Sequence, residues 1–173
     1  MKRRCCFIGQ ESLNEVMVYM ETQGTKELIS KIEKVIDCLV SNNNVSEFIC
    51  NMDIGLTIHA AKSVLNMKKK YSFLKLRCAI PYETQSEYYP EYVRDKYYSI
   101  IEHCDNEVLV SRQKSPIARE RSIQYMIDRS DIVFFICEKS YLNKIKRYVS
   151  MTNADKKYVY LNPKTGKAIV LVR

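Results

Sequence analysis

The chain has 173 residues, of which 46% are hydrophobic and 28% charged, and we expect a single globular domain over residues 1–173. This balance excludes an intrinsically disordered chain, and no apolar run approaches the roughly 18 residues that a membrane-spanning helix needs. The net charge of +8 favours an anionic partner, such as a nucleotide, a nucleic acid or an acidic protein, although solvated lysine-rich helices explain it equally well.

The first residues, MKRRCCFIG, are basic and then briefly apolar. A signal peptide needs an apolar region of at least about seven residues, so this segment is predicted to be the first strand of a cytoplasmic protein. The seven cysteines are odd in number and contain no C-x-x-C, which indicates free thiols in a reducing compartment. A zinc site is not expected, because His59 and His103 are the only histidines and neither has a ligand at metal-site spacing.

Strand-like and helix-like segments alternate along the chain. Strands are predicted over residues 4–9, 46–50, 74–80, 107–111 and 131–137, and helices over residues 26–41, 56–71, 90–104, 117–129 and 141–151. Residues 10–23 read as a loop or short helix. Thr25 is placed to cap the first helix, and three asparagines at 42–44 end it. Residues 158–161 and 168–172 flank a turn-rich connection, which is typical of a hairpin.

Strands separated by single helices imply right-handed crossovers and a parallel sheet. We therefore expect an α/β fold, a Rossmann-like three-layer α/β/α sandwich with a mostly parallel sheet and a C-terminal edge hairpin. Such sheets bind ligands at the carboxyl ends of their strands, near the point where the strand order reverses. Four segments then carry the functional question: residues 9–12, 51–57, 81–89 and 111–121.

Four motifs, three of them overlapping these segments, resemble one family. IGQE (residues 8–11) stands where the family has a strand and a T-G-H-R turn, and NMDIGLT (51–57), followed by Ala60 and Ala61, stands where it has G-[MSA]-A-x-G-x-D. CAIPYETQ (78–85) matches C-A-I-P-[FY]-E-x-Q, and YMIDRSD (125–131) matches Y-M-V-D-x-S-D. Over residues 4–138 the chain thus resembles the YpsA-like proteins of the SLOG superfamily, which also contains DprA and LOG proteins.

The resemblance implies a Rossmann-like core and a nucleotide or nucleotide-derived ligand. Relatives of the DprA type bind single-stranded DNA, and LOG enzymes hydrolyse a glycosidic bond with a glycine-rich phosphate loop and a glutamate. That loop is absent here, since no glycine occurs between Gly55 and Gly166. The turns that carry the motifs give these candidate ligand-binding residues: Gly9, Gln10, Asn51, Asp53, Gly55, Thr57, Glu83 and Gln85. The basic cluster after the fourth predicted strand adds Arg119 and Arg121.

The turn at 51–57 departs from the family pattern in ways that matter for binding. Asn51 replaces a glycine, and asparagine tolerates the left-handed conformation that glycine adopts. Asp53 would repel a phosphate unless a metal or basic group intervened. Alternatively, Asp53 or Thr57 caps the following helix and contacts no ligand.

The other candidates also have two interpretations. Glu83 and Gln85 either recognise a base or ribose, or fix the loop after Pro81. The basic residues Arg112, Lys114, Arg119 and Arg121 either bind phosphate or lie on an exposed helix start. Of the tyrosines at 82–98, Tyr97 is expected to pack in the core with Ile101, which leaves Tyr82, Tyr88 and Tyr89 to stack on a base.

No nucleophile, base and orienting group can be placed together, so no catalytic residue and no metal ligand is predicted. The leading hypothesis is a cytoplasmic protein that binds or senses a nucleotide-derived ligand without catalysis. No cofactor is indicated beyond that nucleotide. The first alternative is a nucleic-acid-binding or protein-interaction module with a vestigial pocket, and a homodimer is compatible with the superfamily. The second is a nucleotide-processing hydrolase, which only the family analogy supports.

Overall fold

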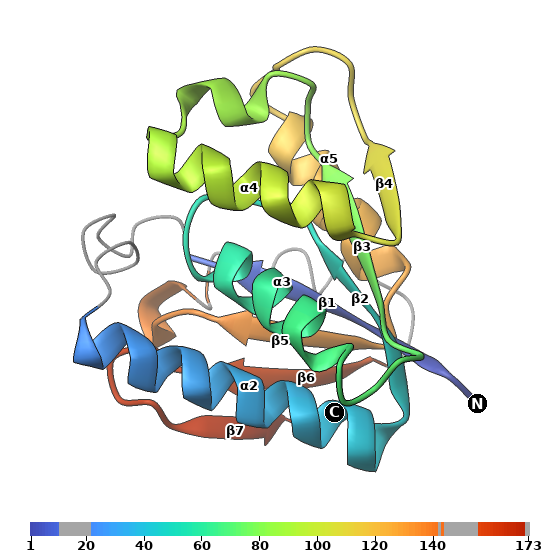
Figure 1. The fold of residues 1–173 in the computed structure, drawn as a ribbon, viewed down its shortest axis with the longest axis vertical. Coiled ribbons are helices and arrows are strands. Elements are labelled where there is room, and N and C mark those ends of the chain that lie inside the picture. Colours follow the sequence, from blue (N-terminus) through green and yellow to red (C-terminus); the bar gives the residue numbers. More distant parts are fainter. Residues whose placement is uncertain (11–21, 142, 144–155, 172–173) are drawn as a thin grey trace.

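The computed structural model describes residues 1–10, 22–141, 143 and 156–171, and a seven-stranded sheet forms its centre (Figure 1). The strand order is β4-β3-β2-β1-β5-β6-β7, and every neighbouring pair is parallel except β6 and β7. The strands are β1 (Arg3–Gly9), β2 (Val45–Cys50), β3 (Lys75–Ile80), β4 (Asn106–Leu109), β5 (Ile132–Ile136), β6 (Lys157–Leu161) and β7 (Ala168–Leu171). The predicted Rossmann-like sheet with a C-terminal edge hairpin is confirmed.

Helices cover both faces of this sheet and complete the three layers (Figure 1). Residues of α2 (Gln23–Asn43), α3 (Leu56–Met67) and α4 (Glu91–His103) pack on one face, and those of α5 (Ala118–Asp128) pack on the other. A short 3-10 helix, η1 (Gln85–Tyr88), precedes α4. The segment predicted over residues 10–23 and the helix predicted over 141–151 lie largely outside the described residues.

The ends of α2 show where capping was predicted correctly and where it was not. Thr22 is the N-cap, since its hydroxyl accepts a hydrogen bond from the Thr25 amide at 3.2 Å. The prediction that Thr25 caps the helix was wrong, because Thr25 already lies in the first turn. The predicted asparagine stop is confirmed: Asn44 is the C-cap, in the left-handed conformation with φ 56°.

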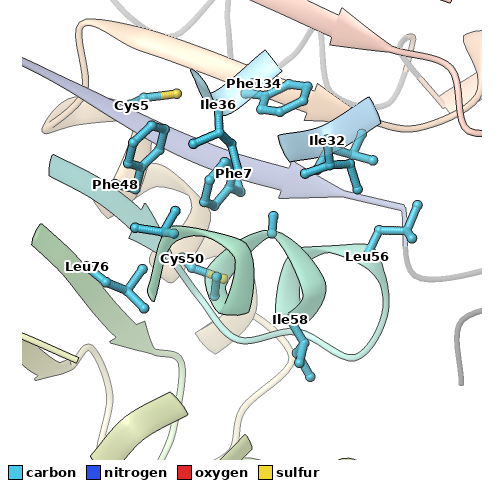
Figure 2. Packing of buried hydrophobic residues seen from close by; sticks show 14 of the residues in the cluster. Cys5, Phe7, Ile32, Ile36, Phe48, Cys50, Leu56, Ile58, Leu76 and Phe134 are labelled. Atoms are coloured by element: carbon cyan, nitrogen blue, oxygen red, sulfur yellow. The ribbon is translucent and has the colours of Figure 1, made fainter. Parts of the chain in front are cut away.

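The alternation of side chains along β1 explains why both faces need cover. Cys5 and Phe7 belong to the core beneath α2, α3 and α4, whereas Cys6 and Ile8 belong to the core beneath α5. Figure 2 shows Phe7 among its neighbours from the adjacent strands, with the ring of Phe48 stacked at 5.2 Å and that of Phe134 edge-on at 5.9 Å. A strand buried on both faces is apolar, as β5 (IVFFI) is throughout and β1 is from Cys5 onward.

The strand order determines which turns lie at the point where the order reverses and which lie away from it. From β1 the chain moves outward through β2, β3 and β4, and then returns to place β5 on the other side of β1. The order therefore reverses between β1 and β5, where Gly9 is level with Ile136. The turns after β2, β3 and β4 lie along the same edge of the sheet, away from this switch point. No helix in the described parts of the chain is long and apolar enough to cross a membrane.

Candidate functional site

The turn after β2 is built by two unusual backbone conformations. Met52 adopts φ 58° and Gly55 adopts φ 129°, which a residue with a side chain rarely does. The left-handed non-glycine residue of this turn is thus Met52 and not Asn51, contrary to the expectation from the family's glycine. The Asn51 side chain instead braces the turn, because its Oδ1 accepts a hydrogen bond from the Asp53 amide at 3.3 Å. The buried Met52 side chain packs in the core.

Asp53 joins this turn to two other elements. Its Oδ2 accepts hydrogen bonds from Arg119 Nε of α5 at 2.6 Å and from Asn51 Nδ2 at 2.7 Å, and its Oδ1 accepts one from Gln85 Nε2 of η1 at 3.2 Å. Arg119 is therefore the basic group that neutralises the Asp53 carboxylate. The pair is partly buried, with side-chain exposures of 12% for Asp53 and 25% for Arg119.

The alternative that Asp53 or Thr57 caps α3 does not describe the geometry. The N-cap is Gly55, and no side chain forms a capping hydrogen bond there. Thr57 Oγ1 donates a hydrogen bond to the Asp53 carbonyl oxygen at 2.7 Å, so it closes the turn from inside the helix. Asn51 and Thr57 are both buried, and neither is among the residues that line the cavity beside the turn.

This cavity has a volume of about 230 Å³ and opens at the carboxyl edge of the sheet. The turns after β2, β3 and β4 all contribute to it, as the parallel arrangement requires. Its lining residues are Asp53, Ile54, Tyr82, Gln85, Tyr89, Lys114, Ser115 and Arg119. Three of the four segments expected to meet, 51–57, 81–89 and 111–121, do so here.

Gln85 is the most distinctive residue of the cavity. Its side chain is 2% exposed, and its Nε2 donates hydrogen bonds to the Asn51 carbonyl oxygen at 3.1 Å and to Asp53 Oδ1 at 3.2 Å. These two acceptors fix the orientation of the amide, since a flipped amide would point oxygen at oxygen. Gln85 Oε1 then remains buried with no hydrogen-bond partner among the described residues. An unpartnered buried acceptor is costly, and this one belongs to a residue that lines the cavity.

Aromatic residues form a second part of the cavity wall. The Tyr89 hydroxyl donates a hydrogen bond to the Met52 carbonyl oxygen at 3.1 Å, which ties η1 to the turn. Burial and, secondarily, the nearby Asp53 charge raise the pKa of Tyr89 well above its usual value, so the hydroxyl stays protonated and continues to donate. Tyr82 also lines the cavity, whereas Tyr88 is exposed and lies under the Lys114 ammonium, which is 3.8 Å from the ring centroid. Tyr97 is buried in the core, as predicted.

At the switch point, described residues of the turns after β1 and β5 contact each other. Gln10 Oε1 accepts a hydrogen bond from the Glu138 amide at 2.9 Å, which links the turn after β1 to that after β5. A Cβ at Gly9 would lie 2.6 Å from Thr57 Cγ2, so the glycine allows α3 to pack against β1. Gly9, Gln10 and Gly55 are not cavity-lining residues. Glu11, which takes part in the same motif, lies outside the described residues.

Two other candidates also lie away from the cavity. Glu83 and Arg121 are exposed, and neither is among the residues that line it. Of the basic residues named from the sequence, Lys114 and Arg119 line the cavity. Ile54 and Ser115 were missed because neither type carries a functional signal in sequence. Ser122, whose Oγ accepts a long hydrogen bond from Asn51 Nδ2 at 3.5 Å, could have been found from its spacing of three residues after Arg119 on the same helix.

The described residues contain no group of three histidine, cysteine, aspartate or glutamate side chains that could hold a metal ion. His59 is buried in α3, and His103 is exposed with its Nδ1 2.8 Å from the Ser99 carbonyl oxygen. Neither histidine lines the cavity. The arrangement offers hydrogen-bond acceptors, aromatic surface and positive charge, which are the means of binding a ligand.

Comparison with known proteins identifies the family to which the chain belongs. A family model described as the YspA SLOG family, or YpsA, matches residues 7–163 of the chain. The chain belongs to the YpsA family. A UPF0398 protein of Brevibacillus brevis is 22% identical over 135 residues, which cover 77% of this chain and 72% of that protein. In structural terms, two of the YpsA motifs meet at the cavity: the turn after β2 supplies Asp53, and CAIPYETQ supplies Tyr82 and Gln85.

Proposed function

We propose that this YpsA-family protein binds a nucleotide or nucleotide-derived ligand in the cavity at the carboxyl ends of β2, β3 and β4. One observation carries the proposal: Gln85, a lining residue of the cavity, has a buried Oε1 without a partner among the described residues. Tyr82 and Tyr89 offer aromatic surface to a planar ring, and Lys114 offers charge to a phosphate. Buried polar groups that converge on a cavity are typical of ligand sites.

The proposed role is binding or sensing, without catalysis. Asp53 is engaged by Arg119, Asn51 and Gln85, so its charge is already compensated by the protein. The structure pairs none of the seven cysteines in a disulfide. The proposed location is the cytoplasm, where glutathione and thioredoxin keep thiols reduced.

Thermal unfolding with a panel of nucleoside monophosphates tests the proposal. A ligand at about 100 times its dissociation constant stabilises the native state by about 2.7 kcal/mol, which predicts a rise in Tm of about 5 to 10 °C. Ser115→Phe fills the cavity and should abolish the rise. Gln113→Phe places the same ring at an exposed position outside the lining residues and should preserve it. If no nucleotide shifts the Tm, or if both variants respond like the wild type, the proposal is wrong.

A second candidate function is nucleic-acid binding, which the exposed basic residues near the cavity favour. Arg112, Lys114 and Arg121 are all exposed, within the segment 111–121. Binding through such residues would depend steeply on salt, because each neutralised phosphate releases counterions. Affinity for single-stranded DNA that is measurable at about 50 mM salt and unaffected by Ser115→Phe would favour this function over a nucleotide cavity.

A further inference from the structure

We infer that the cavity takes the base end of the ligand, with an exocyclic amino group directed at Gln85 and the phosphate outside, near Lys114. The inference rests on the proposed function and specifies it further. It assigns Gln85 and Asp53 to base recognition and Lys114 to the phosphate.

The size of the cavity is the first step. Its volume is about 230 Å³, which is smaller than the roughly 300–1,000 Å³ of pockets that enclose a complete small-molecule ligand. Part of a nucleotide therefore fits, and the remainder must lie at the mouth or beyond it. The question is which end enters.

The chemistry of the inner wall favours the base. Gln85 Oε1 has no partner among the described residues, and Asp53 Oδ1 accepts a single hydrogen bond there, from Gln85 Nε2. A carboxylate oxygen accepts two hydrogen bonds, so two neighbouring lining residues, Gln85 and Asp53, each retain an acceptor position. A fully ionised phosphate has no hydrogen to donate and would leave both acceptors without a partner. An amino group carries two hydrogens and satisfies both.

The aromatic residues of the cavity and the lysine at its opening are consistent with the base lying inside and the phosphate outside. Tyr82 and Tyr89 line the cavity, and aromatic side chains stack on the faces of nucleobases. Arg119 is held in the ion pair with Asp53, so its charge is compensated. Lys114 is exposed at the same cavity and places its ammonium over the Tyr88 ring, where it can meet an anion approaching from solvent.

Ligand analogues test the inference on the unmodified protein. The probe is whichever of AMP, CMP and GMP binds most tightly by calorimetry, and its analogue carries a dimethylated exocyclic amino group. Dimethylation removes both donors, so we expect the dissociation constant to rise at least about tenfold, since a buried acceptor again loses its partner. UMP and IMP, which lack the amino group, should bind as weakly as the analogue, and ribose 5-phosphate should not bind measurably.

Two charge variants test the position of the phosphate. Lys114→Met should weaken the monophosphate about two- to fivefold at low salt while leaving the corresponding nucleoside unchanged. Arg121→Met is the matched control, because it removes an exposed charge of the same helix region that is not part of the lining. It should change neither dissociation constant.

The results separate this inference from the proposed function. Ribose 5-phosphate that binds as tightly as the monophosphate, or a dimethylated analogue that binds unchanged, would overturn the base-inward orientation while nucleotide binding itself stood. The same holds if Lys114→Met weakens the nucleoside as much as the monophosphate. If no nucleotide binds the wild-type protein at all, both the proposed function and the inference fail.

Discussion

At the residue scale, Asp53 connects three elements that are distant in sequence. Its carboxylate accepts hydrogen bonds from Asn51 in its own turn, from Gln85 in η1 and from Arg119 in α5. These contacts hold the cavity wall in place even without a ligand. They also orient the Gln85 amide, on which the proposed recognition depends.

We predict that Asp53→Ala lowers the free energy of unfolding by about 2 to 3 kcal/mol, measured by urea denaturation. The substitution leaves three buried or half-buried donors without their acceptor, but the partial exposure of Arg119 moderates the loss. Glu83→Ala is the control, because Glu83 is an exposed carboxylate that does not line the cavity, and it should change stability by less than about 0.5 kcal/mol. Equal effects of the two substitutions would show that the Asp53 contacts contribute nothing.

Several of these residues could be identified from the sequence, but the contacts between them could not. Asp53, Gln85 and Arg119 were all candidates, because each lies in a segment that follows a strand of the sheet. Their pairing could not be predicted, since Asp53 and Arg119 are 66 residues apart and nothing in sequence fixes the distance between two side chains. Met52 was missed for a similar reason: a buried methionine gives no sign that it adopts a left-handed backbone conformation.

At the element scale, hydrophobic periodicity predicted the helices and strands well but their ends less reliably. The helix predicted over 56–71 ends at Met67, and the strand predicted over 107–111 ends at Leu109. Thr22 and Thr25 are both good capping residues by type. The choice between them depends on which has the extended backbone, and only Thr22 does, with φ −73° and ψ 157°.

The packing of α3 on β1 leads to a prediction about Gly9. Gly9→Ala would place a Cβ 2.6 Å from Thr57 Cγ2, so we expect a loss of about 1 to 3 kcal/mol in the free energy of unfolding. Thr57→Ser removes that methyl group but keeps the hydroxyl that bonds the Asp53 carbonyl oxygen.

A double-mutant cycle decides the cause of that loss. In the Thr57→Ser background, Gly9→Ala should cost at least about 1 kcal/mol less than in the wild type, as expected for two residues in direct contact. Additive effects would mean that Gly9 is needed for a reason other than this close approach.

At the scale of the whole molecule, the fold followed from the sequence, whereas the place of the described cavity on the sheet edge did not. Alternation of strands and helices predicts a parallel sheet with cover on both faces, and the observed order, β4-β3-β2-β1-β5-β6-β7, agrees. Ligands of such sheets are expected at the switch point. Here Gln10 links the turns of β1 and β5, and Thr57 packs against Gly9, while the cavity lies over β2, β3 and β4. Where along the sheet edge a cavity forms depends on side-chain packing, which periodicity does not report.

The most direct test of this account is an amide NMR titration with the tightest-binding nucleoside monophosphate. We expect saturable shifts of the Gln85 side-chain amide and of the backbone amides of Ile54 and Tyr82, because these residues line the cavity. The amides of Gly9 and Glu138, at the switch point, should shift little. Largest shifts at Gly9 and Glu138, with the Gln85 side chain unchanged, would place the ligand between β1 and β5 and contradict the account.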